Sequence, residues 1–422
     1  MFRCELHRLD GNEQLWSDWR DLLQRVKPEL RLLTPEWFSV WGHTIGSEAP
    51  WTTGIEVVAV YDDADGKLFG LLPVGHPKVG LLRVNAMAGY YQPSRVILAD
   101  ESCEYAVGRS VAWFLVELGW NLIQLGPWPM SHKAHLGALS ALNELEMPIQ
   151  KQSSCGVAIA ELPATWSQYR DEVIDRKLLR RLNNAEKQLC RAHQIDVQHH
   201  RQPSEAETRE LIATLGQIEQ RSWLPNDPRG RPRFMGATAQ QFWLELIQQT
   251  LIPHDQLDCW TMSADGQPIS FVLAMTSGST RYVIANNYDE SFATNRPGSL
   301  LYRRMFEEGF SRGVTRYDFG TNELHYKKQW GAQYLDRMDT FTVAANRIVA
   351  GFWNAGIKLK GLFDGVLLSR ATHQAQHTSG EPLPSPAFSD VKQLDSILAE
   401  ADELLSKQDT QKMDECEALA VS

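Results

Sequence analysis

Hydrophobic and polar positions follow strand and helix periods along much of the chain, most clearly about two thirds of the way along it. Residues 282–288 are rich in aromatic and β-branched side chains, which favours a strand. Over residues 299–311 apolar side chains recur at helical spacing, and Gly313 is the kind of residue that ends a helix. Residues 315–319 predict a second strand. The pattern therefore predicts a strand, a loop, a helix and a strand, which together form a βαβ unit.

The loop that opens this helix contains Arg296, Pro297, Gly298 and Ser299. The N–H groups at a helix start are unpaired and carry partial positive charge, which suits a phosphate group. Gly298 leaves room for the backbone to approach such a group, and Arg296 adds a charge-assisted hydrogen bond. We expect these four residues to bind the phosphates of a donor. A helix start without any ligand is the alternative.

A similar layout occurs in the first half of the chain. In each half two predicted strands flank an Ala-Asp-Gly turn, and a helix-ending glycine is followed by a strand-ending glycine at the same spacing. The matching segments are 56–61 and 67–74 with 257–262 and 268–275, the turns 64–66 and 264–266, and Gly119 and Gly126 with Gly313 and Gly320. We therefore expect two copies of one α/β unit. The first copy has no counterpart of the Arg-Pro-Gly loop, so we expect it to supply packing and part of a substrate wall.

Specific motifs close the second copy. They are Asp318-Phe319-Gly320, then Glu323, then Tyr326-Lys327-Lys328-Gln329-Trp330-Gly331. Together with Pro297-Gly298, this tract resembles the CelD-like acyltransferases of the GNAT superfamily. That family is associated with cellulose and exopolysaccharide synthesis and is close in architecture to the FemABX aminoacyltransferases. The chain departs from the family in having Arg296 where Ser is usual and Asn322-Glu323-Leu324 where a Gly-Asp-Glu run is usual.

The resemblance implies an α/β fold, with α+β mixed sheets, made of tandem GNAT-like domains (acyl-CoA N-acyltransferase domains) of which the first is degenerate. The expected organisation is a degenerate domain over residues 1–155, an acyltransferase domain over 156–345, C-terminal helices over 346–375 and an acidic flexible tail over 376–422. The second domain is expected to hold the donor.

Acyl transfer to an amine needs a held donor, an acceptor for the amine proton, and stabilisation of the oxyanion and the leaving thiolate. Asp318, Glu323 and His325 are the candidate bases, although Asp318 has a structural cap or a partner for Lys327 as its alternative role. The resemblance implies that Tyr326 protonates the thiolate, as a tyrosine does in many GNAT enzymes. Lys327 is the candidate for neutralising a phosphate or the oxyanion.

Composition adds limits to these expectations. Of the 422 residues, 43% are hydrophobic and 22% charged, which is typical of a globular chain of two or three domains. No apolar run approaches the roughly 20 residues that span a bilayer, and the N-terminus lacks a signal-peptide core, so we expect a cytoplasmic protein. The six cysteines form no metal-binding or disulfide pattern, and no metal is expected. The net charge of −10 argues against nucleic acid as the main partner.

Positive charge nevertheless gathers on one predicted amphipathic helix, residues 166–193. Its polar side carries Arg176, Lys177, Arg180, Arg181, Lys187 and Arg191. A solvated face is one interpretation, and attraction to a polyanionic substrate or an anionic membrane surface is the other. Residues 381–422 have the opposite character, with 10 acidic and 3 basic residues.

The leading hypothesis is an N- or O-acetyltransferase, or another acyltransferase, that uses acetyl-CoA or a longer acyl-CoA to modify an amino sugar or polysaccharide precursor. The acceptor class is implied by the resemblance alone. One alternative is a FemABX-type transferase that uses aminoacyl-tRNA, although the chain lacks the pair of heptad-repeat helices common in those enzymes. The other is an inactive GNAT-like scaffold that binds a polysaccharide synthase. The expected partners are a small-molecule or glycan acceptor, with peripheral membrane or synthase association, and the oligomeric state is left open.

Overall fold

The computed structural model of the chain describes residues 2–47, 54–79, 82–89, 95–226, 232–321, 325–351 and 353–355. Three predictions fall outside these ranges. They concern Glu323, most of the C-terminal helices expected over 346–375, and the acidic segment 376–422. No helix in the described ranges has both the length and the apolar character needed to cross a bilayer.

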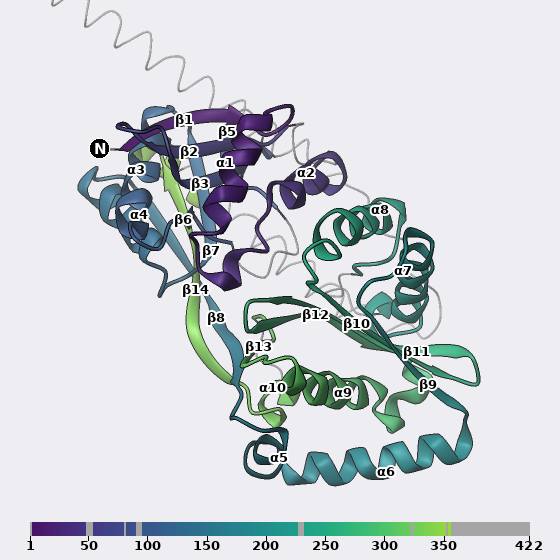
Figure 1. The fold of residues 1–422 in the computed structure, drawn as a ribbon. Coiled ribbons are helices and arrows are strands. Elements are labelled where there is room, and N and C mark those ends of the chain that lie inside the picture. Colours follow the sequence, from purple (N-terminus) through teal and green to yellow (C-terminus); the bar gives the residue numbers. More distant parts are fainter. Residues whose placement is uncertain are drawn as a thin grey trace, which may run out of the picture.

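The first half of the chain forms one lobe of sheet and helices (Figure 1). Its elements are β1 (Phe2–Arg8), α1 (Glu13–Leu23), η1 (Pro28–Leu30), α2 (Pro35–His43), η2 (Ile45–Ser47), β2 (Glu56–Asp62), β3 (Leu68–Gly75), β4 (Lys78–Val79), β5 (Leu82–Met87), β6 (Leu98–Ala99), α3 (Glu104–Glu117), β7 (Leu122–Pro129), α4 (Lys133–Glu144) and β8 (Ile149–Glu161). The predicted hairpin and the helix ending before Gly119 are confirmed, and residues 2–8 form an edge strand paired with β2.

The second half forms the other lobe. Its elements are α5 (Trp166–Gln168), η3 (Tyr169–Val173), α6 (Arg176–Ala192), β9 (Ile195–His200), α7 (Glu205–Gln220), η4 (Leu224–Asn226), α8 (Ala237–Leu246), η5 (Ile247–Leu251), β10 (Leu257–Ala264), β11 (Gln267–Ser277), β12 (Thr280–Tyr288), η6 (Glu290–Asn295), α9 (Pro297–Ser311), β13 (Arg316–Asp318), α10 (His325–Gln329) and β14 (Gln333–Ala344). The single helix expected over 166–193 is in fact α5, a π-helical turn and α6, because residues 174 and 175 leave helical geometry.

The strand order confirms the predicted duplication. One continuous sheet runs β1-β2-β3-β5-β7 in the first lobe and, from the far edge inward, β9-β10-β11-β12-β13 in the second. In both runs the first four strands are antiparallel, and the last pair is parallel because a helix, α3 or α9, connects its members. The turn between β10 and β11 forms at Asp265 and Gly266, whose φ angles of 50° and 80° suit a tight hairpin.

Two long strands join the lobes. β14 lies between β7 and β8, and β8 continues past β14 to pair with β13. The two strands run side by side from one lobe to the other (Figure 1). Residues 338–343 of β14 pair with β7 of the first lobe. β8, which follows the first copy in sequence, therefore pairs with the second lobe. β14, which follows the second copy, pairs with the first lobe.

The core of the second lobe fixes α9 against the sheet. This helix begins at Pro297, whose ring suits a first helical position, and ends before Gly313, which has a φ of 72°. Its Phe306 ring stacks on Tyr317 with centroids 4.0 Å apart and on Trp330 at 5.1 Å. The start of α9 is thereby held beside the end of β12.

Candidate functional site

The site is built where β12 and β13 part. The two parallel strands pair only from Thr280 to Tyr282 on β12 and from Arg316 to Asp318 on β13. Beyond Tyr282, no described residue pairs with this edge of β12, although the strand continues to Tyr288. The edge therefore offers backbone N–H and C=O groups to a ligand.

A β-bulge lies directly beyond the point of separation. On β11, Leu273 is opposite Ala285 and Ala274 is opposite Val283, so Ile284 is an extra residue without an opposing partner. A bulge interrupts the ladder of hydrogen bonds and increases local twist, and bulges are common next to active sites. Here the bulge reorients β12 beside the carboxyl end of β13.

The loop after β12 leads into α9 through a strained residue. Arg296 is exposed and adopts the left-handed conformation, with φ 52° and ψ 45°, which is uncommon for a residue other than glycine. α9 has no side-chain N-cap, and the N–H groups of Ser299 and Leu300 both donate to the Arg296 carbonyl, at 3.0 and 3.1 Å. The Gly298 N–H is left without a partner in the described part of the chain. This end of the helix can accept an anion.

Gly298 also has a role in packing. A Cβ at this position would lie 2.5 Å from Oδ1 of Asn286 on β12, and Nδ2 of that asparagine donates to the Gly298 carbonyl at 3.2 Å. The absence of a side chain therefore allows α9 to pack closely on β12. A bulky residue at 298 would disturb packing as well as any ligand, so it cannot separate the two effects.

Two stacked tyrosines lie beside this helix start. Tyr302 is 3% exposed, and its ring lies 6.0 Å from that of Tyr326, which is 36% exposed. Burial raises the pKa of Tyr302 well above its usual value, and the neighbouring Tyr326 raises it further. Burial also raises the pKa of Tyr326. Both hydroxyls therefore stay protonated near neutral pH, as a proton donor to a thiolate requires. Sequence patterns did not single out Tyr302, because its helical spacing is that of any core position.

Asp318 ends β13 and faces the first lobe. Its neighbour Tyr317 points the other way, onto Phe306 of α9, because side chains alternate along a strand. Burial raises the pKa of Asp318 to about 6, although the N–H of Gly320, 2.6 Å from Oδ1, and the charge of Arg316 favour the ionised form. A carboxylate with this pKa can accept a proton near neutral pH.

Asp318 lines a cavity of about 150 Å³ that both copies enclose. The second copy contributes Tyr282, Arg316 and Asp318, and the first contributes Lys27 and His132 among others. Tyr282 ties the lobes together by donating to the Glu29 carbonyl at 3.1 Å. The first-copy residues come from segments distant in sequence, so no motif could have identified them.

Comparison with known proteins identifies the fold of this region. Residues 176–328 match the family model described as an acetyltransferase (GNAT) domain. This segment, about a third of the chain, has a GNAT-like fold. No curated protein matches the chain in sequence.

Among solved structures, FemX is 12% identical, with a TM-score of 0.53 over 80% of this chain and 96% of its own. A tandem GNAT protein of the clavulanic acid biosynthesis pathway is 9% identical, with a TM-score of 0.46 over 82% of this chain and 99% of its own. The alignment with FemX covers the first copy as well as residues 176–328, so the similarity in fold includes both copies. At 12% identity it concerns the fold alone.

Three other residues were predicted for the site, namely Lys327, His325 and Glu323. Lys327 is 2% exposed, and its ammonium donates to the carbonyls of Gly320 and Thr321 at 3.3 and 2.6 Å, so it holds the loop after β13. The expected contact with a phosphate finds no support in this geometry. His325 is exposed and lies 3.3 Å from the Gln329 amide. Glu323 lies outside the described residues.

A cluster of His199, Asp258 and Glu308 has side-chain atoms close enough to hold a metal ion. Its carboxylates are already paired with guanidinium groups. Arg281 contacts Asp258 at 3.0 Å and Glu308 at 2.8 Å, and Arg312 contacts Asp258 at 3.0 Å. This charge balance gives the cluster a structural role under the end of α9.

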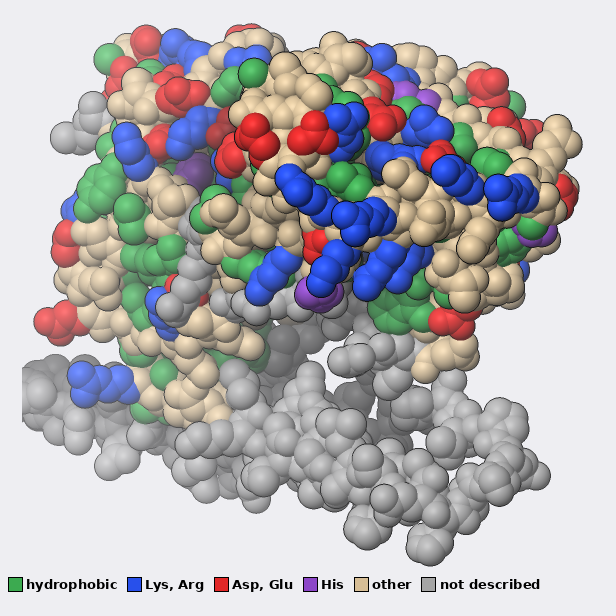
Figure 2. All heavy atoms as spheres, turned by 90° about the horizontal axis from the view of Figure 1, so that it is seen from below, with side chains coloured by type: hydrophobic (Ala, Val, Ile, Leu, Met, Phe, Trp, Pro, Cys, Tyr) green, Lys and Arg blue, Asp and Glu red, His purple; other side chains and the backbone are tan. Residues whose placement is uncertain are grey.

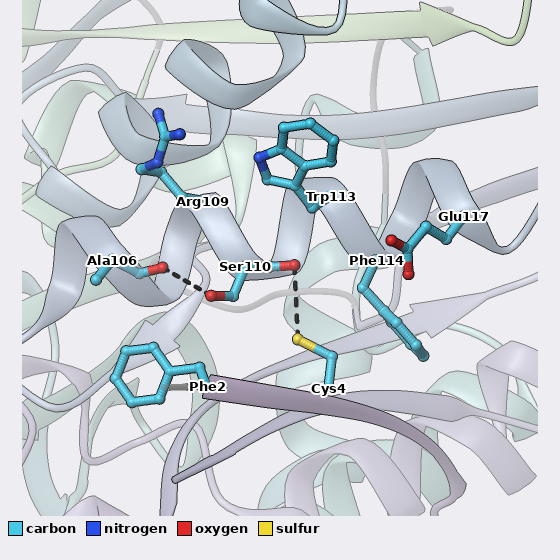
Figure 3. Close-up of a pocket in the computed structure, with 8 residues that line it drawn as sticks. All are labelled: Phe2, Cys4, Ala106, Arg109, Ser110, Trp113, Phe114 and Glu117. Carbon is cyan, nitrogen blue, oxygen red and sulfur yellow. Dashed lines mark hydrogen bonds between the residues drawn. The ribbon is translucent and has the colours of Figure 1, made fainter. Parts of the chain in front are cut away.

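A larger hollow of about 470 Å³ lies on the first lobe between β1 and α3 (Figure 3). Burial raises the pKa of its Cys4 thiol to about 12, and the thiol donates to the Ser110 carbonyl at 3.5 Å. Arg109 is already paired with Glu144 at 2.6 Å. The hollow thus offers no activated nucleophile, and the cavity between the lobes is the stronger candidate site.

Proposed function

We propose that the protein is an acyl-CoA-dependent acyltransferase that acts on an amino or hydroxyl group of an amino sugar or polysaccharide precursor. The observation that carries the proposal is the position of Asp318. A carboxyl group with a pKa of about 6 lies where β12 and β13 part, and it faces a cavity walled by both copies. The acetyltransferase description of the matched family model supports the reaction class.

The residues around the start of α9 fit a CoA donor. The free Gly298 N–H, the helix dipole and the exposed Arg296 guanidinium favour its phosphates. The unpaired edge of β12 suits an extended chain that carries amide groups, because such a chain can use the strand's N–H and C=O groups. When bound, acyl-CoA supplies an acyl group as a thioester.

In the proposed reaction the acceptor enters from the cavity between the lobes. Its nitrogen or oxygen forms a bond to the acyl carbon, the carbon–sulfur bond breaks, and the acceptor proton passes to Asp318. Tyr326 donates a proton to the departing thiolate, which its raised pKa allows because the hydroxyl is protonated before transfer. The backbone N–H groups beside the Ile284 bulge are the candidates to stabilise the oxyanion.

The test combines donor binding with turnover across pH. We expect Asp318→Asn to bind acetyl-CoA as the wild type does and to lower kcat/KM by about 10²–10⁴ with amino-sugar acceptors. Wild-type kcat/KM should rise with pH through about 6, as Asp318 loses its proton, and then level off. Arg296→Ala should weaken acetyl-CoA binding. The matched control for Asp318→Asn is Asp63→Asn, at an exposed turn of the first lobe. Full turnover by Asp318→Asn, or no binding of acetyl-CoA or longer acyl-CoAs by calorimetry, would contradict the proposal.

A further inference from the structure

α6 carries a strongly basic outer face. Between residues 176 and 192 the chain has six basic residues and one acidic residue, a net +5, whereas the whole chain has a net charge of −10. The buried side of α6 consists of Leu178, Leu182, Ala185 and Leu189. The single acid, Glu186, is held by Arg303 of α9 at 2.5 Å and by Arg304 at 3.2 Å. Nothing within α6 itself neutralises the outer face.

Five cations on that face are unpaired. Lys177, Arg180, Arg181, Lys187 and Arg191 are exposed, and none has an ion pair or side-chain hydrogen bond with a described residue. At 3.6 residues per turn, the five positions fall within about 120° of one another around the helix axis, which places them in a row along one side of the helix. At 1.5 Å per residue the row is about 21 Å long. We name these five residues the basic row.

The basic row points out of the molecule. α6 is the outermost element on its side of the second lobe (Figure 1). Figure 2 views the molecule from that side and shows Lys and Arg side chains gathered across the face. A plane brought up to the protein from this side can therefore contact all five residues together.

We propose that the basic row docks the protein onto an anionic phospholipid bilayer. Anionic headgroups complement its charge, and a bilayer contacts this one face without surrounding the protein, whose other residues carry a net charge of −15, −10 less +5. A nucleic acid strand fits less well. It would bend around the protein and meet the acidic remainder, and the exposed positions of the row hold no aromatic side chain on which bases could stack.

The test measures co-sedimentation of the full chain with vesicles, without any acyl donor, so the result is independent of the proposed acyl transfer. We expect binding to phosphatidylcholine vesicles that contain 30% phosphatidylglycerol, and little binding to phosphatidylcholine alone. Binding should weaken steadily as salt rises from 50 to 500 mM, because screening shortens the reach of surface charge.

Variants distinguish an effect of the basic row from an effect of the protein's net charge. Arg180→Ala/Arg181→Ala/Lys187→Ala should weaken vesicle binding about 100-fold, at about fivefold per charge. Arg31→Ala/Lys67→Ala/Lys133→Ala removes the same charge from exposed positions of the first lobe and should bind as the wild type does. Arg180→Lys/Arg181→Lys should also bind normally, because a bilayer responds to charge rather than to guanidinium geometry. Far-UV circular dichroism checks that each variant is folded.

Several outcomes would overturn the proposal. One is equal binding to neutral and anionic vesicles, and another is an unchanged affinity in the triple α6 variant. Displacement of the vesicles by stoichiometric RNA would assign the row to nucleic acid. Displacement by a stoichiometric peptide of residues 381–422, whose 10 acidic and 3 basic residues give −7, would assign it to the chain's own acidic segment.

Discussion

Asp318 shows how one side chain can serve activity at the expense of stability. Burial raises its pKa from 3.8 to about 6, so the ionised form is less favourable in the folded protein than in the unfolded chain. The sign follows from proton counts. Between these two values the unfolded chain has released the proton and the folded protein has kept it, so stability falls as pH rises. Above about pH 6 the full cost in stability remains, in the pH range where the proposed reaction needs the carboxylate as a base.

Asp318→Asn should therefore stabilise the protein while it inactivates the proposed enzyme. We expect the free energy of unfolding at pH 7.5 to rise by about 1–3 kcal/mol, at about 1.4 kcal/mol per pKa unit with allowance for partial exposure. The gain should vanish by about pH 3, where the carboxyl is protonated in both the folded protein and the unfolded chain. Urea unfolding at the two pH values measures this. An equal gain at both would show that packing, not ionisation, is responsible.

The elements differ in how far local sequence determines them. β12, α9 and β13 were predictable because helix periodicity, Pro297 and Gly313 act over a few residues. The edge strand β1 was not, since its stability comes from pairing with β2, about 55 residues away. The bulge at Ile284 likewise depends on the register between strands. The candidate site divides in the same way. The motifs marked Asp318 and Tyr326, but Tyr302 and the cavity wall depend on tertiary packing.

The buried ion pairs under α9 give an element-scale prediction. Asp258 and Arg281 are both 0% exposed, and Arg281 also donates to the Met305 carbonyl of α9 at 3.0 Å. Asp258→Ala would remove one of the two carboxylates that pair with the buried Arg281 and leave only Glu308. We expect a loss of about 3–5 kcal/mol in the free energy of unfolding at pH 7, against little change for the exposed Asp196→Ala control.

The contribution of Asp258 to stability should depend on pH in the opposite direction to that of Asp318. Burial raises the pKa of Asp258, but the His199 hydrogen bond and the Arg281 charge outweigh it and hold the pKa below its usual value. Its contribution is therefore complete above the unfolded pKa of about 3.9 and is lost as pH falls through the folded value. The gap between wild type and Asp258→Ala in urea unfolding should narrow below about pH 4. A gap that stays constant from pH 7 to pH 3 would rule out an ionic contribution.

At the scale of the whole molecule, duplication alone does not make two independent domains. The predicted boundary between residues 155 and 156 falls inside β8, which spans Ile149–Glu161. A cut there divides β8, so that residues 149–153, which pair with β14, are separated from residues 159–161, which pair with β13, and it removes β14 from its place beside β7. The cavity lined by Asp318 would be lost as well, because both lobes wall it.

The two copies should therefore fold only together. Residues 1–155 and 156–345 expressed alone should each leave a strand edge that the intact chain covers, and neither should unfold cooperatively in urea. A cut at 163/164, in the connection between β8 and α5, keeps β8 whole, so coexpressed fragments 1–163 and 164–422 should copurify as a folded complex. The full chain should show a single transition by both tryptophan fluorescence and circular dichroism. A cooperative transition in fragment 1–155 alone would show that the first lobe does not need β14, and the shared strands would then be a contact between finished domains.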